Sequence, residues 1–113
     1  MAVTPKKIIA GSELTGSAAT YYTAPANTRV IIKKLTFTNK HATDAINVTV
    51  YLIPSGGAAG DNNTLVDAKA VGPKECWECT QAEGHVLEAA GFIQALASTA
   101  AEVTIQGSGV EIT

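Results

Sequence analysis

The amino-acid sequence predicts a single-domain, all-β protein, and three observations lead to this fold class. About eight short apolar segments follow one another at spacings of roughly 8–12 residues, separated by turns rich in Gly and Pro. Within most segments apolar and polar residues alternate, as in strands with one buried face. Strands do not alternate with helices, which argues against a parallel sheet. Together these features favour a two-sheet sandwich or a small barrel.

The size and charge of the chain limit its functions. With 113 residues it has the length of one domain. Charged residues make up only 16 % of it, against roughly 25 % in ordinary soluble domains. Either partners cover part of the surface, or the surface is an uncharged, threonine-rich sheet. The net charge of −2 and the scattered lysines argue against nucleic acid as a partner. Neither a membrane-spanning run nor a secretory leader is recognisable, so we expect folding in a cytoplasm and no membrane partner.

The N-terminal segment, residues 1–16, is predicted to form an arm or a short edge strand ahead of a sandwich domain over residues 17–113. Lys6 to Ile9 could form a short strand, whereas Gly11 to Gly16 is polar and rich in turn formers. An arm here could lie on a neighbouring subunit, or the segment could be a frayed terminus.

Two strands are predicted next. Thr20 to Thr23 is the first, and Pro25 stops it because proline lacks a ladder donor. The second, residues 28–38, has apolar residues that are out of phase: Ile32 points away from the face that carries Leu35. Either both faces of its first half are covered, or a bulge near Lys33 and Lys34 switches the phase.

The middle of the chain shows the most regular alternation, over Ile46 to Ile53. The turn-rich stretch Asn39 to Asp44 is expected to join this strand to residues 28–38 as a hairpin. Pro54 to Asn63 is predicted to be a long flexible loop. Further strands are predicted over Leu65 to Val71, Glu75 to Gln81 and Phe92 to Ala97.

The C-terminal segment is predicted to contain two short strands. Val103 and Ile105 alternate with polar residues, and so do Val110 and Ile112. The run Gly107-Ser108-Gly109 between these strands is expected to reverse the chain.

The segment Cys76-Trp77-Glu78-Cys79 is the one motif that could carry chemistry. Such a pair can bind zinc or act as a redox dithiol, but no second pair follows, and the segment is predicted to be extended. In a strand, residues three apart lie roughly 10 Å apart on opposite faces, beyond the ~7 Å limit of a disulfide. The two cysteines are thus not expected to bridge each other within one chain. Because no second pair supplies further ligands, Cys76 and Cys79 are only weak metal candidates. The other interpretations are isolated thiols, or an intersubunit contact or disulfide involving Cys76, Trp77 and Cys79 that forms after cell lysis.

Other polar residues form no catalytic motif. The glycine-rich stretch Gly56 to Gly60 lacks the Lys-Ser/Thr ending of a phosphate loop, and the aspartates lack calcium-loop spacing. We therefore expect neither an enzyme nor a cofactor.

Four segments carry a resemblance to a known group: Pro25 to Thr28, Val48 to Pro54, Ile93 to Ala97 and Gly109 to Ile112. In these segments, and in strand and turn texture over residues 14–113, the chain resembles small virion proteins of tailed bacteriophages. The Cys-Trp-Glu-Cys segment is not part of that resemblance.

The resemblance implies a single-domain antiparallel β-sandwich, jelly-roll-like, with about eight short strands. It implies a capsid decoration (cement) protein that binds the outside of the capsid and bridges capsomers, with the major capsid protein and copies of itself, as a homotrimer, as partners. The implied location is the capsid surface of the virion, after assembly in the host cytoplasm. A neck, tail or head-fibre position is an alternative. A second alternative is a glycan-binding adhesion module that uses the loop Ser55 to Asn63.

Overall fold

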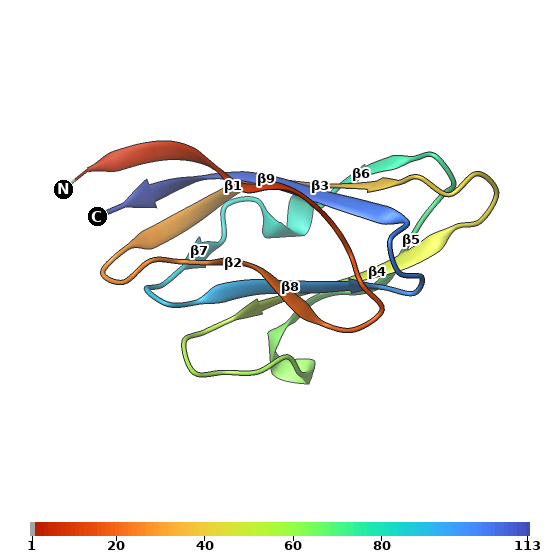
Figure 1. Ribbon diagram of the computed structural model, residues 1–113. Coiled ribbons are helices and arrows are strands. Elements are labelled where there is room, and N and C mark those ends of the chain that lie inside the picture. The colour runs from red at the N-terminus through yellow and green to blue at the C-terminus, as the bar shows by residue number, and fades with distance from the viewer. Residues whose placement is uncertain (1) are drawn as a thin grey trace.

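The computed structural model describes residues 2–113, which form two antiparallel sheets packed face to face (Figure 1). The five-stranded sheet contains, in spatial order, β1 (Val3–Glu13), β9 (Val103–Ile112) and β3 (Arg29–Asn39), followed by the short strands β6 (Cys76–Glu78) and β7 (Val86–Leu87). The four-stranded sheet contains β2 (Ala19–Thr23), β8 (Phe92–Ala97), β4 (Ile46–Ile53) and β5 (Thr64–Val71). The predicted all-β class is confirmed, and of its two architectures the chain forms the sandwich.

The strand pairing is that of a jelly roll. β1 pairs with β9, β2 with β8, β3 with both β6 and β7, and β4 with β5. β6 and β7 both pair with the same edge of β3. The chain therefore resembles one long hairpin, in which each strand of the first half pairs with a strand of the second half. The pairs β3–β9 and β4–β8 then roll this hairpin into two sheets. Two Greek keys wound in this way define a jelly roll, so the predicted arrangement is confirmed.

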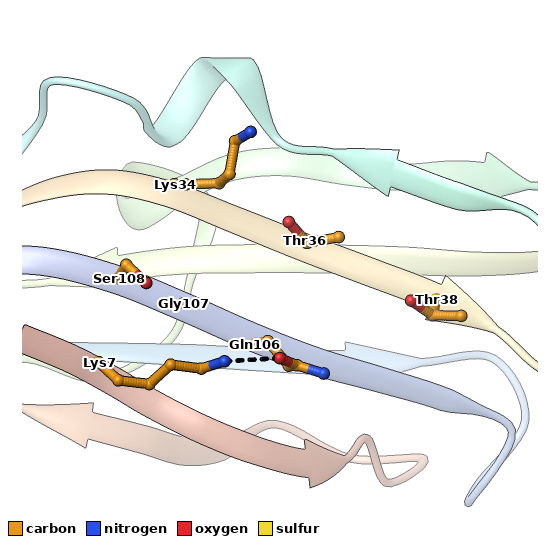
Figure 2. A pocket seen from close by; sticks show the side chains of 7 residues that line it. All are labelled: Lys7, Lys34, Thr36, Thr38, Gln106, Gly107 and Ser108. Atoms are coloured by element: carbon orange, nitrogen blue, oxygen red, sulfur yellow. Dashed lines mark hydrogen bonds between the residues drawn. The ribbon is translucent and has the colours of Figure 1, made fainter.

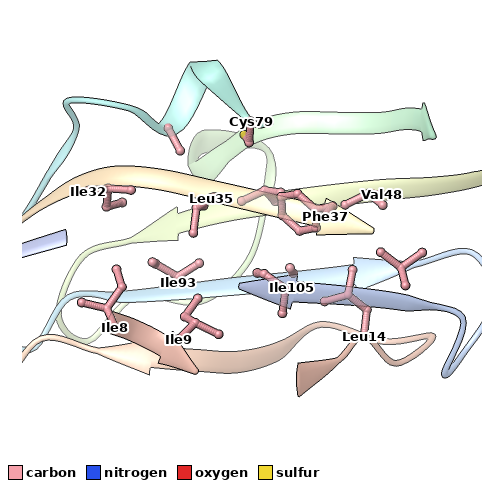
Figure 3. Packing of buried hydrophobic residues seen from close by; sticks show 14 of the residues in the cluster. Ile8, Ile9, Leu14, Ile32, Leu35, Phe37, Val48, Cys79, Ile93 and Ile105 are labelled. Carbon is pink, nitrogen blue, oxygen red and sulfur yellow. The ribbon is translucent and has the colours of Figure 1, made fainter. Parts of the chain in front are cut away.

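The core lies between the inner faces of the two sheets (Figure 3). In β8 and most of β9 alternate side chains are buried, and Phe37 of β3 is the largest side chain that is fully buried. Among the described residues, every buried side-chain nitrogen or oxygen has a hydrogen-bond partner. The central buried residues are Ile32, Leu35, Phe37 and Ile105 from one sheet, and Val48, Val50, Ile93 and Ala95 from the other.

The phase change in β3 is a bulge, one of the two alternatives that the sequence left open. The register with β9 shifts between Ile32 and Lys34, so Lys33 is the extra residue. Ile32 before the bulge and Leu35 after it are both fully buried. One inserted residue therefore keeps both halves of the strand facing the core.

The expected hairpin of residues 28–38 with Ile46–Ile53 is wrong, because β3 and β4 lie in different sheets. The buried side chain of Asn39 anchors the crossover between them. Its Nδ2 atom donates to the carbonyl oxygens of Val71 (2.9 Å) and Asp44 (3.1 Å), and its Oδ1 atom accepts from the backbone N–H of His41 (2.9 Å). Alternation shows which face of a strand is buried, but it does not show which sheet the strand joins.

The expected chain reversal at Gly107-Ser108-Gly109 is also wrong. β9 runs without a break through these residues, between β1 and β3. A Cβ atom on Gly107 would lie 2.7 Å from Leu35 Cδ2, and one on Gly109 would lie 2.7 Å from the carbonyl oxygen of Ile31. The glycines therefore serve close packing of a central strand rather than a turn.

The N-terminal strand is longer than Lys6–Ile9. β1 spans Val3–Glu13 at the edge of the five-stranded sheet, and its pairing with β9 has two register shifts. Gly11 lies in the second of these irregular stretches, with a φ of +131° that favours glycine. The polar residues after Ile9 thus continue the strand. Leu14, the first residue after the strand, is fully buried.

Helical structure within residues 2–113 consists of two 3-10 turns, η1 (Asp61–Asn63) and η2 (Thr80–Ala82). No helix in this range is long and apolar enough to cross a membrane. The strand expected over Glu75–Gln81 is shorter than predicted, because β6 ends at Glu78 and the chain turns through η2.

Candidate interaction surfaces

The two cysteines lie on opposite sides of the five-stranded sheet. Cys76 begins the edge strand β6 on the outer face, where its Sγ atom lies 3.6 Å from Thr38 Oγ1. Cys79 follows the strand and is fully buried, with its backbone N–H donating to the carbonyl oxygen of Leu35 at 2.8 Å. Figure 3 shows Cys79 among the core side chains. Trp77, between them, stacks on Phe37 with the ring centres 5.5 Å apart.

Neither cysteine belongs to a group of metal ligands. In the part of the chain that the structure describes, no three His, Cys, Asp or Glu side chains are close enough together to hold a metal ion. His41 lies in the crossover after β3, where its Nδ1 atom accepts from the backbone N–H of Asp44 at 3.0 Å. His85 lies elsewhere, between η2 and β7.

The different surroundings of the two thiols predict different reactivity. Burial raises the pKa of the Cys79 thiol, which disfavours the reactive thiolate, whereas Cys76 is exposed. With iodoacetamide at neutral pH, we expect one adduct on the native protein, at Cys76, and a second only after denaturation. Intact-mass spectrometry measures this directly, and Cys76→Ser should abolish the native adduct. Modification of Cys79 at the rate of Cys76 would contradict the buried position.

The outer face of the five-stranded sheet contains a shallow polar trough (Figure 2). Lys7 Nζ donates to Gln106 Oε1 at 2.7 Å on one side, and Lys34 pairs with Glu78 at 3.2 Å on the other. The trough has a volume of about 240 Å³, below the roughly 300–1,000 Å³ of typical small-molecule sites. The residues that line it are Lys7, Lys34, Thr36, Thr38, Gln106, Gly107 and Ser108. This face is thus hydroxyl-rich and carries charges of both signs.

Two other hollows lie at the end of the sandwich where β1 begins and β9 ends. One, of about 420 Å³, lies beside the exposed ion pair of Arg29 with Glu88 (2.9 Å). The other, of about 190 Å³, is more apolar and includes Leu52, Val86 and Leu87. Neither contains a nucleophile next to a general base, the arrangement that covalent catalysis requires.

A polar bridge links the two sheets near that same end. Tyr22 of β2 donates its hydroxyl to Glu111 Oε2 of β9 at 2.6 Å, and Lys6 of β1 lies 3.4 Å from the same oxygen. The hydrogen bond from Tyr22, assisted by Lys6, lowers the pKa of Glu111 below its ordinary value, and burial opposes this shift. Burial and the neighbouring carboxylate raise the pKa of Tyr22.

This bridge makes part of the stability dependent on pH. The pKa of Glu111 is lower in the folded than in the unfolded chain, so its contribution is complete above the ordinary value of 4.5 and is lost as the pH falls through the lower folded value. We expect urea midpoints of Glu111→Gln to fall less than those of the wild type between neutral and acidic pH. Glu88→Gln is the control, since its exposed ion pair contributes little. An unchanged pH dependence in Glu111→Gln would contradict the bridge.

The outer face of the four-stranded sheet has a different character. β2, β8 and β4 contain no charged residue at all. Since Val50 and Ala95 lie in the core, their strand neighbours point outward. We define the charge-free face by the outward residues Thr20, Asn47, Tyr51, Gln94 and Leu96, which are exposed or partly exposed.

Charges occur only at the side of this sheet, on β5. Lys69 there places its ammonium 5.9 Å from the ring centre of Trp77, and Asp67 is exposed. The charge-free face could not be recognised from the sequence. Three uncharged strand segments are visible in the sequence, but only the fold shows that they are neighbours in one sheet.

Three aromatic side chains, Trp77, Tyr22 and Tyr51, lie on different sides of the sandwich. Trp77 stacks on Phe37 beside the core, and Tyr22 points between the sheets towards Glu111. Tyr51 lies on the outer face of the four-stranded sheet.

Comparisons with known proteins give a result for the fold alone. No protein-family model matches the chain, and no curated protein sequence matches it. A chain in the structure of the infectious bursal disease virus Gx strain superposes on 97 % of this chain with a TM-score of 0.53 at 15 % identity. Chains in the VP2 subviral particle and the Gt strain of the same virus give TM-scores of 0.40 and 0.37, too low to support an argument.

The Gx-strain likeness shows a shared β fold. This chain spans about a third of the matched viral chain, 31 % of its length. The β-sandwich described above is therefore a fold also present in a chain of a virus structure.

Proposed function

We propose that the protein is a structural component of a virus particle, and more specifically a capsid decoration protein of a tailed bacteriophage. In this role it binds the outside of the capsid and bridges capsomers. The observation that carries the proposal is the jelly-roll sandwich, which over 97 % of this chain matches part of a chain in a virus structure. The assignment to a tailed bacteriophage depends on the sequence resemblance over residues 14–113.

The two outer faces suit a bridging role because they differ in chemistry. The outer face of the five-stranded sheet carries charged side chains, including the Lys34–Glu78 ion pair. The charge-free face carries uncharged polar and apolar side chains. A protein that connects two different neighbours needs two surfaces that do not compete for the same partner. Such a protein acts by shape and requires no catalytic group.

The edges of the five-stranded sheet are protected against uncontrolled strand pairing. One edge of the five-stranded sheet carries Pro5, Lys6 and Lys7, and the other consists of the short strands β6 and β7. Lysine, proline and short strands all prevent edge-to-edge aggregation. Contacts of the five-stranded sheet in an assembly are therefore expected through its outer face and not through its edges.

Copy number in purified particles tests the proposal. Since a closed symmetric shell repeats each binding site, a decoration protein should be present at on the order of a hundred copies or more. Gel densitometry against the major shell protein measures this number. About a dozen copies or fewer would instead indicate a neck or tail position. A particle reconstruction with and without the protein should show its density on the outer capsid surface; density elsewhere would refute the decoration role.

A further inference from the structure

We propose that the charge-free face is a self-association surface, at which two copies of the chain pair face to face about a twofold axis. This inference does not depend on the proposed function.

The chemistry of the face fits burial against protein. Leu96 and Tyr51 lie outward on the central strands β8 and β4, and both remain partly exposed. The hydroxyl of Tyr51 takes part in none of the side-chain hydrogen bonds found within residues 2–113, and it is therefore free to bond with a partner. Gln94 lies between Thr20 and Tyr51, with its Nε2 atom donating to Thr20 Oγ1 at 2.9 Å. Its amide thus occupies the middle of the face.

A second copy is the occupant that the distribution of charges favours, because its own charge-free face brings no charge into the contact. Docking of the charge-free face on the other outer face would bury Lys7, Lys34 and Glu78 against a surface that offers them no opposite charge. Removing these groups from water is costly even for the Lys34–Glu78 ion pair, because the desolvation penalty can exceed the attraction between the two charges. When two charge-free faces meet, no charge in these strands loses its water. A twofold axis brings one patch against itself in this way.

The size of the face predicts weak association. Strands lie about 4.8 Å apart and rise about 3.3 Å per residue, so the three strands β2, β8 and β4 cover roughly 300 Å². A standard interface buries about 800 Å² on each partner. We therefore expect a pair that dissociates readily, with a dissociation constant of about 0.1–1 mM. The high local concentration in an assembled shell would favour such a contact.

Charge reversal at the centre of the face provides the test. Sedimentation velocity on the wild-type chain, up to about 1 mM, should show a reversible monomer–dimer equilibrium. Gln94→Glu and Gln94→Lys should each weaken it by about tenfold or more, because like charges then face each other across the axis. An equimolar mixture of the two variants should associate again. Gln106→Glu, on the outer face of the other sheet, is the matched control and should leave the equilibrium unchanged.

Several outcomes would overturn the proposal. These are a monomer over the whole concentration range, a particle with the mass of three copies, or equal weakening by the Gln106 and Gln94 substitutions. Failure of the mixed variants to associate would also refute a face-to-face pair. Circular dichroism of each variant separates lost association from lost folding. Particle copy number does not enter these measurements, so the proposed function stands or falls separately.

Discussion

Replacing Phe37 by alanine is expected to lower the free energy of unfolding by about 3–5 kcal/mol. Phe37 is fully buried near the middle of the core, and its ring stacks on Trp77 with an interplanar angle of 27°. Truncation removes this contact and leaves a cavity between rigid sheets, which cannot collapse to fill it. Small domains are stable by only about 5–15 kcal/mol, so this variant should be close to unfolding at room temperature.

Urea unfolding followed by the fluorescence of Trp77, the single tryptophan, measures the loss. The control is Phe92→Ala, because Phe92 is the other phenylalanine and remains partly exposed on β8. That substitution should lower the free energy of unfolding by about 1 kcal/mol, because folding removes less of the Phe92 side chain from water. Equal costs at the two positions would contradict the position of the core.

Replacing Gly109 by alanine is expected to destabilise the protein by about 3 kcal/mol, at the upper end of the range for overpacking. The added Cβ atom would lie 2.7 Å from the carbonyl oxygen of Ile31, which belongs to the neighbouring strand β3. This oxygen can retreat only if the sheet itself distorts. The smaller entropy of the unfolded alanine variant offsets under about 1 kcal/mol of the cost.

Gly107→Ala is the matched comparison, on the same strand and facing the same side. There the nearest atom is Leu35 Cδ2, also at 2.7 Å, but it is the end of a flexible side chain that can move. We expect a cost of about 1 kcal/mol, measured as the shift in urea midpoint at constant slope. If Gly107→Ala proved as costly as Gly109→Ala, backbone contact would not be the reason for the glycine at position 109.

The two outer faces show how composition and fold combine. A charge content of 16 % is low for a soluble domain, and the sequence allowed two explanations, covered surface or an uncharged sheet. In the structure the charges are unevenly placed: β2, β4 and β8 have none, while β1 and β3 carry lysines and an arginine. The low charge is therefore a property of one face, and the self-association experiment tests whether that face is covered.

Local patterning alone indicated most of the strands and the buried sides of the regular ones, and it offered a bulge in β3 as one of two explanations of the phase change. These features depend on neighbours in the chain, since side chains alternate between faces and one extra residue reverses the alternation. The same reasoning placed Cys76 and Cys79 on opposite sides of an extended segment, and Cys76 is exposed while Cys79 is buried.

Only the tertiary structure decided which strands share a sheet, because that depends on contacts between distant residues. It separated β3 from β4 through the buried Asn39, and it placed Gly107 and Gly109 inside a strand that the sequence would have ended there. A glycine that permits a turn and a glycine that permits close packing look alike in a sequence. The difference lies in the strand beside it, here β3, whose carbonyl oxygen at Ile31 leaves no room for a side chain.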